Sequence, residues 1–353
     1  MAERVASGGG SGAFPRWVLW LLFLSVGGGG CGGTDEKPGV ILTLAAYTTP
    51  REVYSQYLLP RFQEFWRQET GEMVRFQESY AGSGAQSRAV VGGFEADVVA
   101  LSLAPDVDRI ARAGLITHDW RSRPYGGIVT RSIVVMAVRE GNPLGIRDWH
   151  DLVRPGLRIL TPDPRTSGGA MWNLCAVYGA ALRGKVEGVR GDEASAADFL
   201  RRVLANVLVM DKGARESITN FERGIGDVAL TYENEVLAAR RAGRPMDYVV
   251  PRSTILIENP VAVVDAYVDR HGSRAAAEAF LEFLWRPENQ LAFAEHGFRP
   301  VEPTVADQVV ARFPVPEDLW TIEALGGWDR VIQEIFGPEG LYPRLREELA
   351  TSP

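Results

Sequence analysis

The segment PDPRTSGGAMWNLCAVYGAAL, residues 162–182, is a proline-bounded turn followed by an apolar stretch of helical length. Ser167, Gly168 and Gly169 stand where that helix would begin. Backbone N–H groups are unpaired at a helix start, and the helix dipole is positive there. Glycine lets a ligand come close to the backbone, and serine adds a hydroxyl donor. The segment therefore predicts either a capped helix or a helix start that holds an anion.

A second segment has the same arrangement. In YAGSGAQS, Gly82, Ser83 and Gly84 also precede a predicted helix. Serine and glycine are favoured helix caps in any protein, so either segment alone is more often a cap than a ligand site. If the two segments belong to different lobes, they would face each other across a cleft.

The pattern along the chain indicates an α/β protein with two lobes. With 353 residues the chain is too long for one compact core of ordinary size. Short apolar strands alternate with helices in two successive blocks. The predicted strands are 40–46, 73–78, 96–101, 132–139, 157–161, 207–210, 228–232, 254–257 and 261–264, and the predicted helices include 54–67, 85–92, 107–113, 194–204, 275–285 and 287–295. The last two strands would return the chain to the first lobe.

The composition argues against several functions. A net charge of −7 gives no general attraction for nucleic acid, and 46% hydrophobic with 24% charged residues is typical of a soluble globular protein. The four histidines lack metal-ligand spacing, and the sequence contains no HExxH motif, P-loop or GxSxG elbow. We therefore expect no metal, no cofactor and no catalysis. The alternative is an enzyme that reuses an anion cleft, for which no base or nucleophile is identifiable.

The N-terminus is predicted to be an export signal. Residues 17–26 form a short apolar run after two arginines, followed by four glycines and Cys31. The run is shorter than the roughly 20 apolar residues of a membrane span. Cys31 resembles a bacterial lipoprotein processing site, although Gly28 stands where leucine is usual. We expect a signal peptide over 1–31, a lipid anchor on Cys31 and a linker over 32–39.

Seven motifs in order resemble those of the periplasmic sulfate-binding proteins of ABC importers, over about residues 42–330. They are AYTTPREVY (46–54), YAGSGAQ (80–86), EADVVALSLAPDVDRIARAGLI (95–116), GNPLGIRDWHDL (141–152), ILTPDPRTSGGAMWN (159–173), GARESITNFERGIGDVALTYENE (213–235) and NPVAVVD (259–265). Several motifs in one order are far more specific than any single motif.

The resemblance implies a type II periplasmic-binding-protein fold, in which two α/β lobes joined by hinge strands close on a central ligand cleft. It implies a first lobe over 40–130 and 258–310, and a second lobe over 131–257. Residues 311–353 would form a C-terminal helical extension, which could pack on either lobe.

The resemblance also implies a site in which uncharged donors hold a dehydrated oxyanion. The matching positions are Thr48, Ser83, Ser167, Gly168, Gly169, Ala214 and Tyr232. Two of them depart from the family, which has Asp where Thr48 stands and Trp where Tyr232 stands. Thr48 keeps the backbone N–H, but a phenol can accept as well as donate, unlike an indole. Arg51, Lys212 and Arg215 lie beside these motifs and could steer anions.

The expected ligand is sulfate, because a site without acceptors rejects the proton of phosphate. Thiosulfate, phosphate and molybdate stay open as alternatives. The expected protein is a monomeric periplasmic receptor that delivers its ligand to ABC permease subunits in the inner membrane. It would touch the membrane only through the anchor on Cys31.

Overall fold

The computed structural model describes residues 37–351. The predicted signal peptide, Cys31 and most of the predicted linker lie outside the described residues. The described part belongs to one unit, Glu36–Pro353.

Ten described strands form a mixed sheet in the order β2-β1-β3-β9-β4-β7-β5-β6, with β10 paired to β9 and β8 paired to β4. The strands are β1 (Lys37–Tyr47), β2 (Glu72–Ala81), β3 (Val98–Ala100), β4 (Ile128–Arg139), β5 (Ile159–Pro162), β6 (Val207–Asp211), β7 (Val228–Tyr232), β8 (Met246–Val249), β9 (Ser253–Val263) and β10 (Asp318–Trp320). Alternation of strands and helices in the sequence thus does produce an α/β fold.

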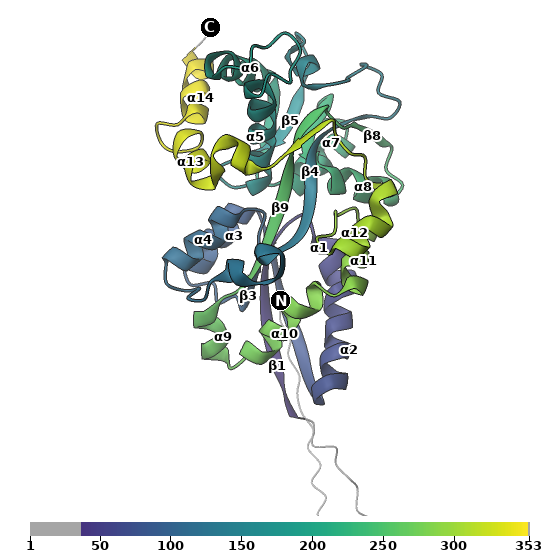
Figure 1. Cartoon of the computed structure of the whole chain (residues 1–353), viewed down its shortest axis with the longest axis vertical. Coiled ribbons are helices and arrows are strands. Elements are labelled where there is room, and N and C mark those ends of the chain that lie inside the picture. Colours follow the sequence, from purple (N-terminus) through teal and green to yellow (C-terminus); the bar gives the residue numbers. More distant parts are fainter. Residues whose placement is uncertain (1–36, 352–353) are drawn as a thin grey trace, which may run out of the picture. The chain divides into compact units, whose positions relative to one another are not determined.

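The sheet has two parallel halves joined by two antiparallel strands. In the first half β1 is parallel to both β2 and β3, and in the second half β5 is parallel to both β6 and β7. Between them β4 and β9 run side by side in opposite directions, as Figure 1 shows. Because β9 also pairs with β3 and β4 also pairs with β7, these two strands connect the halves.

The prediction of separate strands at 254–257 and 261–264 is wrong, because β9 is continuous through both. The polar residues Glu258 and Asn259 interrupt the apolar pattern where β9 crosses between the halves. Asn259 is buried there and donates its side-chain N–H to the Ser102 carbonyl, 3.3 Å away. Its polarity therefore reflects a buried partner rather than a turn.

Helices cover both halves (Figure 1). Those of the first half are α1 (Arg51–Val53), η1 (Tyr54–Leu58), α2 (Leu59–Thr70), α3 (Ser83–Val91), α4 (Ala104–Arg112), α9 (Asp265–His271), α10 (Arg274–Leu284), α11 (Pro287–Glu295) and α12 (Pro303–Val309). Those that follow strands of the second half are α5 (Gly168–Leu182), α6 (Glu193–Ala205), α7 (Ala214–Glu222) and α8 (Glu233–Arg241). Two more, α13 (Gly327–Glu334) and α14 (Leu341–Thr351), end the described chain.

The aromatic stripe of the predicted helix 54–67 is core, as its helical spacing indicates. Phe62 is fully buried, and its ring lies 5.0 Å from that of Phe280 on α10. Phe65 stacks on Phe283 of the same helix, with 5.4 Å between ring centroids. The stripe thus attaches α2 to α10 through the core of the first half.

The C-terminal segment packs mainly on the second half. Strand β10 pairs with β9, and α14 packs against α6. Trp320 lies directly over Gly179 of α5, where an added Cβ would lie 2.1 Å from the indole ring. Helix α13 also contacts α4 of the first half. Within this segment the structure has the short strand β10 and the helices α13 and α14.

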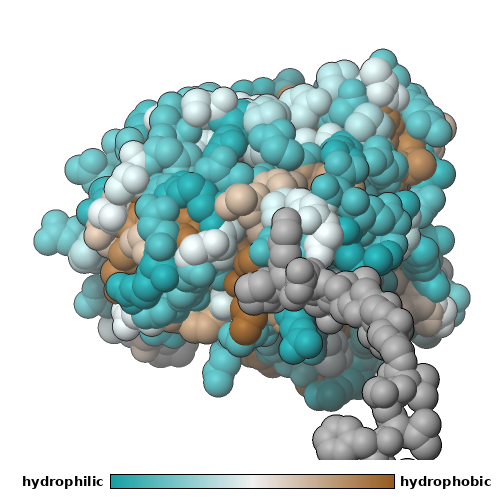
Figure 2. All heavy atoms as spheres, turned by 90° about the horizontal axis from the view of Figure 1, so that it is seen from below, coloured by the Kyte–Doolittle hydropathy of each residue, from teal (hydrophilic) through white to brown (hydrophobic). Residues whose placement is uncertain are grey.

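The surface at the end of the protein shown in Figure 2 is mostly hydrophilic, with small separated hydrophobic areas. Within residues 37–351, no helix is both long enough and apolar enough to cross a membrane.

The contact between Gly179 and Trp320 gives a test of how the C-terminal segment is attached. Gly179→Ala should displace Trp320 from α5, because the methyl group would overlap the indole. We expect a lower melting temperature, measured by calorimetry, and faster cleavage by trypsin within residues 314–353, measured by limited digestion. Gly92→Ala is the matched control, since Gly92 is exposed and has a φ of −79°. Equal melting temperatures for the two variants would contradict this attachment.

Candidate functional site

Three segments of the first half begin at the same edge of the sheet because each follows one of its parallel strands. Thr48 follows β1, Ser83 follows β2 as the first residue of α3, and Ser102 follows β3. Since β1 is parallel to β2 and β3, the carboxyl ends of these strands lie at the same sheet edge. Ligands of open α/β sheets bind at that edge.

The second half supplies a matching set. Ser167 precedes α5 in the turn after β5, Ala214 begins α7 after β6, and Tyr232 ends β7 and precedes α8. The two edges meet around a small cavity, with about 10 Å³ of space for the centres of water-sized molecules. It is lined by Tyr47, Thr48, Thr49, Gly82, Ser83, Ser102, Ser167, Gly168, Gly169, Ala214 and Tyr232. All seven positions predicted from the motifs are therefore among its lining residues.

Sequence reasoning missed three of the lining residues, Tyr47, Thr49 and Ser102, whereas Gly82 belongs to the predicted helix start at Ser83. Ser102 is the most informative omission, because it directly follows the apolar stretch 96–101 that predicted a strand. Its position just beyond the carboxyl end of that strand was the available signal.

The cavity lining carries no formal charge at neutral pH. Burial raises the pKa of Tyr47 and of Tyr232 above the ordinary tyrosine value, so both hydroxyls keep their protons. The lining contains no carboxylate, histidine or lysine. Over the described part of the chain, no group of three or more His, Cys, Asp or Glu residues could hold a metal ion.

Backbone N–H groups are the main donors that the cavity offers. Gly168 and Gly169 form the first turn of α5, and Ala214 and Ser83 are the first residues of α7 and α3. N–H groups in a first helical turn have no intrahelical acceptor, and they lie at the positive end of the helix dipole. Ser167 is only 3% exposed and adds a hydroxyl at the same place. Such a set of donors suits a small anion.

The hydroxyl of Ser83 is already engaged inside the first half. It donates to Asp106 Oδ2 at 2.6 Å and accepts from the Ser102 N–H at 3.0 Å. Burial raises the pKa of Asp106, and Arg109 lies 2.6 Å from its other oxygen. In this conformation the contribution of Ser83 to the cavity is therefore its backbone N–H.

Two glycines let the halves approach each other. A Cβ on Gly82 would lie 2.4 Å from the Thr166 carbonyl oxygen of the second half. A Cβ on Gly168 would lie 2.8 Å from both Ser102 Oγ and Leu103 Cγ of the first half. Real Cβ atoms do not tolerate such distances, so the glycines at both motifs serve contact between the halves as well as access to the backbone.

Hydrogen bonds across the cleft hold this closed arrangement. Trp172 Nε1 donates to the Ser102 carbonyl at 2.9 Å. Arg215 of the second half also donates to the Thr49 carbonyl of the first half at 3.2 Å and pairs with Glu52 at 2.9 Å. Its Nε also lies 3.1 Å from the buried Glu235 of its own half.

Arg215 therefore pairs with two carboxylates and links the two halves. Its charge is not free to attract an anion, contrary to the role considered for it from the sequence. Of the other two cations considered, Arg51 lies over the Tyr80 ring at 5.5 Å. Lys212 accepts a hydrogen bond at its carbonyl from Thr166, 2.9 Å away.

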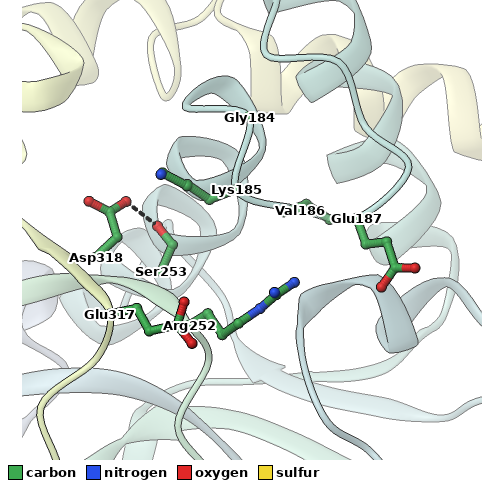
Figure 3. Close-up of a pocket in the computed structure, with 8 residues that line it drawn as sticks. All are labelled: Gly184, Lys185, Val186, Glu187, Arg252, Ser253, Glu317 and Asp318. Carbon is green, nitrogen blue, oxygen red and sulfur yellow. Dashed lines mark hydrogen bonds between the residues drawn. The ribbon is translucent and has the colours of Figure 1, made fainter.

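Two of the larger hollows contain charged side chains and are therefore poorer candidates for a site with uncharged donors. One, of about 490 Å³, lies beside residues 184–187 and combines Lys185 and Arg252 with Glu187, Glu317 and Asp318 (Figure 3). Its three carboxylates disfavour an anion. The other, of about 530 Å³, is lined by residues that include Arg88, Arg109, Arg165 and Arg346, with Asp163 paired to Arg165 at 2.5 Å.

Comparisons with known proteins agree with this geometry. Residues 42–299 match the family described as bacterial extracellular solute-binding protein. The chain is 44% identical to a sulfate-binding protein of Synechococcus elongatus over 91% of this chain and 92% of the relative, and 42% identical to one of Escherichia coli over 94% and 98%. A solved structure, the sulfate-binding protein SubI of Mycobacterium tuberculosis, superposes with a TM-score of 0.77 at 40% identity, covering 84% of this chain and all of that one.

The chain belongs to the sulfate-binding protein family of extracellular solute-binding proteins. Membership confirms the resemblance drawn from the seven motifs and the two-lobed α/β fold that it implied. In this family member, the two sheet halves are the two lobes and the cavity lies between them. Tyr232 and Ser102 contact each other across it, with 2.6 Å between their hydroxyl oxygens.

The two contact glycines predict variants that fold but cannot close. Gly82→Ala and Gly168→Ala should each lower affinity for sulfate at least about 10-fold, because a methyl group would hold the lobes apart. We expect little change in melting temperature and a larger radius of gyration with sulfate present, measured by calorimetry and small-angle X-ray scattering.

Gly84→Ala is the matched control for both variants. Its Cβ would first meet the flexible end of Arg88, at 3.3 Å, and should leave closure intact. Wild-type affinity in Gly82→Ala and Gly168→Ala would show that these glycines do not limit closure.

Proposed function

We infer that the protein is an extracytoplasmic receptor that binds sulfate between its two lobes and delivers it to an ABC permease. The observation that carries this inference is a cavity lined only by uncharged hydrogen-bonding groups, where loops from both sheet halves meet. Family membership, with sulfate-binding proteins among the relatives, supports the same ligand.

Sulfate fits the donor set because it is a full dianion at neutral pH and needs only donors. Hydrogen phosphate carries a proton that needs an acceptor, and a buried unmade hydrogen bond costs about 1–3 kcal/mol. The lining has no carboxylate to accept that proton. Tyr232 stands where the family has tryptophan, and its hydroxyl still offers a donor in place of the indole N–H. Burial raises the pKa of Tyr232, so this hydroxyl stays protonated.

We propose Thr48, Ser83, Ser167, Gly168, Gly169, Ala214 and Tyr232 as the anion-binding residues, with backbone N–H groups as the main donors. The lobe boundaries we propose are 40–130 with 258–310, and 131–257, with β4 and β9 as the hinge. This division agrees with the pairing of β4 and β9 between the two parallel halves.

We propose a receptor without catalytic activity that acts as a monomer. The cavity lining includes serine and threonine hydroxyls but no histidine or carboxylate that could activate one of them as a nucleophile. Nucleic acid is not an expected partner at a net charge of −7.

Sulfate affinity should be nearly independent of pH between 5.5 and 8. No lining residue titrates in that range, since the tyrosine pKa values are raised by burial and tyrosine is neutral below its pKa. Isothermal titration calorimetry should give dissociation constants within about 2-fold at the two pH values, and phosphate should bind more than about 10-fold more weakly. Failure to bind sulfate at either pH would contradict the proposed function, and tighter binding of phosphate, thiosulfate or molybdate would reassign the ligand.

We also propose that Cys31 becomes an acylated N-terminus that anchors the receptor to the membrane. Mass spectrometry of the protein from a membrane fraction should show a chain that begins at Cys31 and carries the mass of a diacylglyceryl group. Cys31→Ser should release the protein into the soluble fraction. An unmodified chain cleaved at another residue would contradict the anchor.

A further inference from the structure

We propose that Ser102 is a positioning residue, which orients the hydroxyl of Tyr232 so that the Ser102–Tyr232 pair donates one O–H to the bound anion. The proposal rests on the proposed function, and it concerns a residue outside the motif-matched set. The two residues belong to different lobes, so closure of the lobes assembles the donor.

Four hydrogen bonds fix the position of Ser102. Its N–H donates to Ser83 Oγ at 3.0 Å, and its carbonyl accepts from Trp172 Nε1 at 2.9 Å and from Asn259 Nδ2 at 3.3 Å. Its hydroxyl lies 2.6 Å from the hydroxyl of Tyr232. Ser102 is 1% exposed. A serine fixed by both backbone groups has little freedom to move its hydroxyl away from Tyr232.

Counting protons shows what the pair can offer. Each of the two hydroxyls carries one proton, and the hydrogen bond between them uses one. The other proton belongs to Tyr232 if Ser102 donates, and to Ser102 if Tyr232 donates. Both residues line the cavity, and within the described chain neither hydroxyl has another hydrogen-bond partner. The proposal takes the first arrangement, in which Ser102 donates to the Tyr232 hydroxyl and the Tyr232 O–H remains for the ligand.

The position of this donor depends on closure. Ser102 follows β3 in the first lobe, whereas Tyr232 ends β7 in the second. Gly168 leaves room for the approach, since a Cβ there would lie 2.8 Å from Ser102 Oγ and 3.0 Å from Ser102 Cβ. Opening the lobes would separate the two hydroxyls and leave Tyr232 without the partner that orients it.

A double-mutant cycle in sulfate affinity tests the pair. Ser102→Ala and Tyr232→Phe should each weaken binding on the order of 10-fold. The double variant should bind about as weakly as Tyr232→Phe alone, because Ser102 acts through the Tyr232 hydroxyl. A purely structural Ser102 would give losses that multiply, together with a lower melting temperature.

Ser87→Ala is the matched control. Ser87 is a fully buried serine of the same lobe, and its hydroxyl donates to the Asp106 carbonyl at 2.7 Å without lining the cavity. It should retain wild-type affinity. Ser102→Cys preserves the side-chain size and supplies only a weak donor, so an intermediate loss is expected even if Ser102→Ala does not fold.

The outcomes separate this inference from the proposed function. A wild-type protein that binds no sulfate overturns both. If the wild type binds sulfate, two results overturn only the role of Ser102. One is an affinity within about 2-fold of the wild type in both Ser102 variants, and the other is a double variant whose loss is the product of the two single losses.

Discussion

The closed cavity depends on close contact between two loops that belong to different lobes. Gly168 at the start of α5 meets Ser102, which follows β3, at distances that leave no room for a side chain on the glycine. This contact brings helix starts from both lobes around one space. An anion bound there would lose its hydration water and accept hydrogen bonds from N–H and O–H donors of both lobes. These hydrogen bonds offset the cost of dehydration only if the donors are already in position. The absence of charge in the lining makes that preorganisation the main source of affinity.

The rest of the fold holds these two loops in position next to each other. Strands β4 and β9 join the halves and leave the parallel strands of each half pointing their carboxyl ends at the cavity. Trp172 donates a hydrogen bond to the Ser102 carbonyl, and Arg215 donates to the Thr49 carbonyl and to Glu52. The C-terminal segment covers α5 through Trp320 and supports the helix whose first turn lines the site.

The fold class and part of the cavity could be predicted from local signals in the sequence, whereas only the family resemblance indicates Thr48, Ala214 and Tyr232. Strand and helix alternation predicts the α/β class, and Ser-Gly pairs before helices indicate donor sites even before the resemblance is considered. What depends on distant residues could not be predicted. Asn259 looks like a strand break until its buried partner Ser102 is known, and Gly179 gives no hint of Trp320. The engagement of the Ser83 hydroxyl by Asp106 likewise requires two helices to pack together.

The most direct test is a crystal structure with selenate, a tetrahedral dianion whose selenium can be located by anomalous diffraction. The account predicts one selenium peak in the cavity, with selenate oxygens about 2.7–3.1 Å from the backbone nitrogens of Gly168, Gly169 and Ala214 and no arginine or lysine in contact. A peak among the arginines of the neighbouring hollow, or a cationic side chain bound to the anion, would contradict it.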